Sequence, residues 1–151
     1  MARYGNLRLA PLRSLKKRIR MIRYIAAFPL VMHGLANIGG VVAFLTKSQA
    51  GFVDRPWIFC QNVKMHSLIG RIFGLVWLLS VVGLIASGLG IVFQQDWWQT
   101  LAILSCAVSL IAIVPWWKSV PPGARFGAIF DVFVIVVLLS PLGQTITNVL
   151  R

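Results

Sequence analysis

The sequence predicts an all-α integral membrane bundle of four transmembrane helices with an amphipathic N-terminal helix. Of its 151 residues, 58% are hydrophobic and 12% are charged, whereas an ordinary soluble domain has about 25% charged residues. Four apolar stretches are about long enough for a helix to cross the roughly 30 Å hydrocarbon core of a bilayer. Six tryptophans, most of them near the ends of these stretches, are typical of aromatic belts at membrane interfaces.

The charge balance places the first 23 residues at a membrane surface. The formal net charge is +12, and eight of the 15 basic residues lie in positions 1–23, beside an apolar segment. We therefore expect anionic lipid head groups as the partner of this segment, and no nucleic acid. The basic residues expected at the surface are Arg13, Lys16, Lys17, Arg18, Arg20 and Arg23.

Residues 1–23 are expected to form a helix that lies on the cytoplasmic leaflet and leads into the membrane. Its apolar residues recur at helical spacing, while most of its basic residues fall on the other face; these apolar residues are Leu12, Leu15, Ile19 and Ile22. A cleaved signal peptide is not expected, because the apolar stretch continues to Leu45 and is too long for one. An organellar transit peptide is also rich in arginine, and this alternative stays open.

The transmembrane domain is expected over residues 24–151, and its first span over residues 24–45. Pro29, His33, Asn37 and Gly40 share one face of this helix, which should turn toward other helices. Pro29 is a candidate kink. The loop of residues 46–67 carries several aromatic side chains and is expected to rest on the membrane interface.

The second span, residues 68–93, is expected at the centre of the bundle. A stripe of small residues lets neighbouring helices approach it closely; the stripe is Ser80, Gly83, Ser87 and Gly90. The turn at residues 94–96 is so short that the third span, residues 99–117, must run antiparallel to the second. The third span has its own small stripe, Ala102, Ser105, Ser109 and Ala112.

The fourth span is expected over residues 126–142, closed by Ser140-Pro141. Because basic residues accumulate on the cytoplasmic side of membranes, the tail predicts a cytoplasmic N-terminus. With four spans the C-terminus lies on the same side. The expected location is therefore the inner (cell) membrane, with both termini cytoplasmic and the 46–67 loop outside.

Ionisable and polar residues within the spans are the candidates for a functional site, since such residues are costly in a membrane. His33, Asn37, His66, Arg71 and Asp131 fall in the same half of the bilayer when their depths are counted at about 1.5 Å per residue. One interpretation pairs Arg71 with Asp131 and lets a histidine bind a small ligand such as a quinone head group. The other keeps the Arg71–Asp131 pair as a contact that sets the register of two helices, with Asn37 and His33 as interhelical hydrogen-bonding residues and no ligand.

Other chemistry is not expected. One haem cannot easily use both His33 and His66, because they lie at different depths. Cys60 and Cys106 have no metal-ligand spacing, and we expect no metal. Three acidic residues in the whole chain leave little material for acid–base catalysis, so an enzyme is not favoured.

A set of loose motifs occurs over roughly residues 23–142: Arg23, the run His33-Gly34-Leu35 with Asn37, the run from Gly70 to Leu79 (GRIFGLVWLL), the Trp97-Trp98 pair and the helix with Asp131. In these motifs the chain resembles DoxX-like small four-helix membrane proteins. The resemblance implies four short helices with a long first loop. Because some members of the family are subunits associated with quinone-linked sulfur oxidation, it also implies a quinone-linked redox function.

Two functions are consistent with these observations. The first is a non-catalytic accessory or anchoring subunit of a larger membrane complex, with other membrane subunits or a second copy as its partner. The second is a DoxX-like, quinone-linked redox subunit whose polar site lies in the outer leaflet. No resident cofactor is expected under the first function, and quinone is the candidate ligand under the second.

Overall fold

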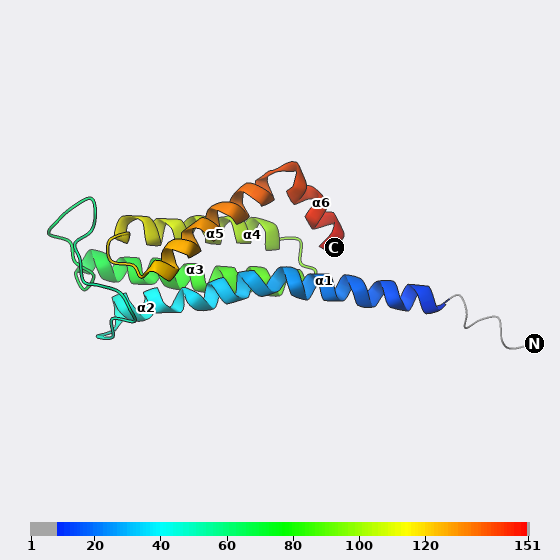
Figure 1. Cartoon of the computed structure of the whole chain (residues 1–151), viewed down its shortest axis with the longest axis horizontal. Helices are drawn as coiled ribbons and strands as arrows, with labels where there is room; N and C mark the ends of the chain where they lie inside the picture. Colours follow the sequence, from blue (N-terminus) through cyan, green and yellow to red (C-terminus); the bar gives the residue numbers. More distant parts are fainter. Residues whose placement is uncertain (1–8, 151) are drawn as a thin grey trace, which may run out of the picture.

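The protein is an all-α bundle in a computed structural model that describes residues 9–150 and the side chains of residues 16–150. The helices are α1 (Leu9–Ala36), α2 (Ile38–Leu45), α3 (Leu68–Val92), α4 (Trp98–Ile113), the short 3-10 helix η1 (Val114–Trp116), α5 (Pro122–Leu139) and α6 (Pro141–Leu150) (Figure 1). Four helical stretches are long and apolar enough to cross a membrane: Lys16–Leu45, Leu68–Val92, Trp98–Trp116 and Pro122–Leu139. These stretches confirm the predicted fold class and make the chain a small multi-pass membrane protein.

Helix α3 lies at the centre of the bundle, as predicted, and packs most extensively against α1 and α4. Both small-residue stripes are buried, the one on α3 and the one on α4. A methyl group at Gly88 would lie 2.5 Å from Val31 Cγ2 of α1, and one at Gly83 would overlap the Ser105 hydroxyl of α4. The absence of side chains at these two positions therefore sets the separation of α3 from its neighbours.

The first span is interrupted at Asn37. Helix α1 continues through Pro29 to Ala36, and α2 begins at Ile38. At the interruption the Gly40 amide donates to the Asn37 carbonyl oxygen at 3.0 Å, one residue closer along the chain than in a regular α-helix. Two glycines follow Asn37, so this part of the helix has little steric resistance to tightening.

The basic N-terminal segment is helical from Leu9 and continues into the first span without a break (Figure 1). The expected boundary at residue 23, between a surface helix and the first span, is therefore not a break in the helix. The physical reason is that residues 12–28 contain neither Gly nor Pro, so nothing in the sequence bends the helix at residue 23. Residues 1–8 of the predicted surface segment, and the side chains of Leu12, Arg13 and Leu15, lie outside the described part of the structure.

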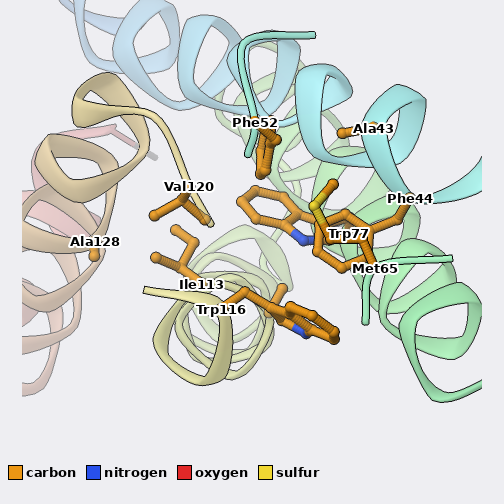
Figure 2. Close-up of a cluster of buried hydrophobic side chains, with 10 residues drawn as sticks. Ala43, Phe44, Phe52, Met65, Trp77, Ile113, Trp116, Val120 and Ala128 are labelled. Carbon is orange, nitrogen blue, oxygen red and sulfur yellow. The ribbon is translucent and has the colours of Figure 1, made fainter. Parts of the chain in front are cut away.

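The 46–67 loop closes one end of the bundle, which we call the loop end; the opposite end, with residues 94–96, is the turn end. Phe52 and Met65 of this loop are buried in an aromatic core with Phe44, Trp77 and Trp116 (Figure 2). The Val53 amide donates to the Ser119 carbonyl oxygen at 2.9 Å, which ties the loop to the connection before α5. The loop therefore enters the core, and only part of it, including the exposed Phe59, fits the predicted interfacial position.

The C-terminal part of the chain differs from the predicted fourth span. Helix α5 begins at Pro122, four residues before the predicted start, and ends at Leu139. A separate helix, α6, then begins at Pro141 and packs back toward the turn end (Figure 1). Its Thr147 hydroxyl donates to the Gln99 side-chain oxygen at 2.8 Å, and the Arg23 guanidinium donates to the Leu150 carbonyl oxygen at 2.9 Å. Ser140-Pro141 closes the last span as expected, but Pro141 also starts a new helix, because proline is well suited to the first helical position.

Replacement of Gly40 by alanine is expected to destabilise the bundle, since the added methyl group would overlap the buried Trp77 ring. Overpacking of this kind costs about 1–3 kcal/mol, or roughly 2–4 °C of melting temperature per kcal/mol for a chain of this size. Thermal unfolding of the purified protein in detergent micelles, followed by circular dichroism, measures the effect. Gly123→Ala is the matched control, because a methyl group there would meet nothing within 4 Å. Equal melting temperatures for the two variants would contradict the proposed contact.

Candidate functional site

The candidate site is built around a buried ion pair between α1 and α5. His33 Nε2 lies 2.8 Å from Asp131 Oδ1, with side-chain exposures of 10% and 0%. The His33 ring also packs against Phe130, with 5.0 Å between ring centroids. Gly127, one turn before Asp131 on α5, leaves room for the imidazole, because a methyl group there would lie 2.8 Å from His33 Cε1.

The second oxygen of the Asp131 carboxylate has no ordinary hydrogen-bond partner. Oδ2 is buried and unpaired among the described residues. The Cys106 thiol on α4 lies near the carboxylate. The position of the carboxylate depends on His33, because an unpaired charge in an apolar interior is strongly destabilising.

Asn37 forms a second polar contact, one turn from His33 toward the loop end. Its amide nitrogen donates to the Ser80 hydroxyl of α3 at 3.0 Å and to the Ser109 hydroxyl of α4 at 3.2 Å. Asn37 is therefore an interhelical hydrogen-bonding residue, as one of the two sequence interpretations holds. Because both amide hydrogens are used in these bonds, the group that remains on this side chain is an acceptor oxygen.

A hollow of about 260 Å³ lies on the loop-end side of the ion pair. Its polar wall is formed by His33 and Asn37, and Trp77 and Phe52 form aromatic parts of the wall. The Trp77 indole N–H is buried and has no acceptor among the described residues. This hollow combines an apolar lining with a few convergent polar groups, which is the usual composition of a small-molecule site.

A second hollow, of about 160 Å³, lies on the turn-end side of the same ion pair. It is lined entirely by apolar side chains, among them Pro29 and Leu30 of α1 and Phe133 and Val137 of α5. We call the boundary between α1 and α5 the seam. His33 and Asp131 connect the two helices across the seam, with one hollow on the loop-end side of the pair and the other on the turn-end side.

The structure does not bring Arg71 or His66 to this site. Asp131 pairs with His33, so the expected Arg71–Asp131 pair is wrong. Arg71 is exposed on α3 and, with His66 and Lys47, lines a separate hollow at the loop end. Sequence depth placed all five candidates in the same half of the bilayer, but it did not specify which face of each helix they occupy.

The basic residues of α1 lie near the turn end. Lys16, Arg20 and Arg23 line a hollow there together with Gln94, while Arg23 also holds the last turn of α6. Lys17 and Arg18 are exposed, and the side chain of Arg13 is outside the described part of the structure. A surface role for these residues stays a prediction.

The sequence analysis missed the contribution of three residues to the site. Ser80 and Ser109 were recognised only as small packing residues, and Cys106 was not expected to contact a charge. For Ser80 and Ser109 the available signal was their position on the small stripes, at a depth similar to that of Asn37. Among the described residues, no group of three or more His, Cys, Asp or Glu side chains could hold a metal ion.

Comparison with protein-family models, curated proteins and solved structures finds no match to this chain. The resemblance to DoxX-like proteins therefore stays a prediction, and the functional argument depends on the geometry of the site.

Proposed function

We propose that this membrane protein binds the polar head group of a small lipid-soluble molecule in the hollow beside His33. The observation that carries the proposal is that His33, which contacts the buried Asp131 at 2.8 Å, lines a hollow of about 260 Å³. Small-molecule sites usually occupy roughly 300–1,000 Å³. A hollow of this size therefore suits a single ring, with the rest of the ligand in the bilayer.

The polar groups select the chemistry of the head group. His33 uses Nε2 for its hydrogen bond with Asp131, so Nδ1 is the ring nitrogen left for a ligand, as an acceptor or a donor according to the tautomer. The Asn37 amide contributes an acceptor oxygen. Carbonyl and phenol oxygens match these groups, and both occur in quinones and quinols. This match supports the quinone alternative raised by the sequence, in which the protein is a DoxX-like subunit of a redox system.

The ligand can reach the hollow from the hydrocarbon layer. Phe126 and Ile129 on α5 are exposed on either side of Gly127, which lines the hollow. Ala36 of α1 also lines the hollow and is exposed. The entrance is therefore flanked by apolar side chains, as expected for a ligand that enters from lipid.

Loss of the ion pair is expected to weaken binding of decylubiquinone by about tenfold or more, because a hydrogen bond to a charged group is worth about 1.5–3 kcal/mol. The double variant His33→Phe/Asp131→Leu tests this without leaving an unpaired charge in the core. Microscale thermophoresis of the full chain in detergent micelles measures the affinity.

His66→Phe is the matched control, since His66 is exposed and lies outside the hollow; its affinity is expected to equal that of the wild type. If the double variant binds as tightly as the wild type, or if the wild type does not bind, the proposed site is wrong.

An accessory or anchoring subunit is the second candidate function, and the outer face of α5 favours it. Only 17% of the residues in the apolar window of α5 are buried, against 50% for α3. Its large exposed apolar side chains, Phe126, Ile129, Val132, Phe133, Val136 and Leu139, form a continuous surface. Such a surface suits another membrane helix as well as lipid.

Purification of the tagged protein from its native membranes in mild detergent, followed by mass spectrometry, tests the accessory function. The expected result is a second membrane protein in stoichiometric yield, lost from an Ile129→Ala/Val136→Ala variant that still folds. Recovery of the wild-type chain by itself would contradict the accessory function and leave the ligand site unaffected.

The proposed location is a cell (inner) membrane with both termini cytoplasmic, and the native cysteines allow a direct test. Cys60 in the 46–67 loop is exposed, whereas Cys106 is buried. A membrane-impermeant maleimide added to intact cells is expected to label the wild type and not Cys60→Ser. Labelling that requires permeabilised cells would reverse the orientation.

A further inference from the structure

Arg71 carries a positive charge on a membrane-spanning helix, and none of the three acidic side chains of the protein forms an ion pair with it in the described part of the structure. It lies one turn inside α3, and its side chain is exposed. The chain has three acidic residues. Asp131 is buried against His33, and Asp96 lies near the far end of α3, about 30 Å away at 1.5 Å per residue. Asp54 accepts the Met65 amide and is not within ion-pair distance of Arg71 in the described structure.

Two further basic side chains share a hollow with Arg71. The hollow has a volume of about 430 Å³, and Lys47, His66 and Arg71 line it together with Phe44, Leu45 and Thr46. It contains no acidic side chain. The guanidinium of arginine offers paired donors that match the oxygens of a phosphate, and lysine adds a point charge.

Local hydrogen bonds fix the backbone at each of these positions. Thr46 caps α2, its hydroxyl donating to the Val42 carbonyl oxygen at 2.7 Å and accepting the Ser48 amide at 3.1 Å, which holds the turn around Lys47. Ser67 caps α3 by accepting the Gly70 amide at 3.2 Å. His66 is therefore held between this cap and the buried Met65.

We propose that this hollow binds a phosphate-bearing anion, with Arg71, Lys47 and His66 as its donors. The lining also has an apolar part, since Phe44 and Leu45 lie beside the three polar groups. A phosphodiester of a lipid head group satisfies both parts, because its glycerol and first methylenes can contact the apolar side chains. Free phosphate offers the same anionic chemistry without the apolar contact.

Native mass spectrometry of the full chain in detergent, titrated with dioleoylphosphatidylglycerol or with inorganic phosphate, tests the site. Arg71→Gln and Lys47→Gln are each expected to weaken binding about tenfold, since each removes a charge-assisted contact. Arg71→Lys keeps the charge but loses the paired donors, and is expected to be intermediate. Lys64→Gln is the matched control, because Lys64 is an exposed loop lysine that does not line the hollow.

The outcomes separate the two sources of phosphate. Binding of the lipid with this dependence on the variants supports a head-group site, and binding of inorganic phosphate with the same dependence supports a site for the free anion. If neither probe binds the wild type, or if Lys64→Gln weakens binding as much as Arg71→Gln does, the proposal is wrong. Each variant is first compared with the wild type by circular dichroism. The result does not depend on the hollow beside His33.

Discussion

The burial of the Asp131 carboxylate in an apolar bundle is the constraint on which the arrangement of α5 depends. A carboxylate without a partner is strongly destabilising in such surroundings, and His33 provides that partner at 2.8 Å. The contact fixes both the rotation of α5 and its height relative to α1. Apart from this contact, two hollows with mostly apolar linings lie beside these two helices. Helix α5 packs mainly against α4, and this polar contact adds its link to α1, so the two together determine how the last long helix closes the bundle and where space remains for a ligand.

The rest of the bundle follows a different packing rule at each end. Near the loop end, large aromatic side chains such as Trp77 and Trp116 fill the centre, and Gly40 leaves room for the Trp77 ring. Near the turn end the core consists mostly of aliphatic side chains, and Gly88 allows close approach of α1 and α3. Asn37, His33 and Asp131 lie between these two regions. The polar groups consequently face close-packed side chains of α3 and α4, whereas the hollows remain on the side of α5.

The sequence was sufficient to predict features that depend on hydropathy and helical spacing. The apolar runs located the spans, and the small residues of α3 identified its buried face. The partner of Asp131 was mistaken because depth along a helix was compared without rotation about its axis. Arg71 is nine residues before Ser80, which places it about 180° away at 100° per residue; since Ser80 is buried, Arg71 must face outward. No comparable rule relates α1 to α5, because no short turn connects them. Helix α6 was missed because Pro141 was interpreted only as the end of the fourth span, although it also starts the next helix.

The bond from Arg23 to Leu150 joins residues 127 positions apart, and the ion pair joins residues 98 apart. Proteins are made from the N-terminus, and early segments fold before later ones are available. Helices α1, α3 and α4 can therefore assemble through their small residues while α5 is still being synthesised. During that interval His33 has no carboxylate to contact. The contacts that α5 and α6 make with α1 are therefore the last that the growing chain can form.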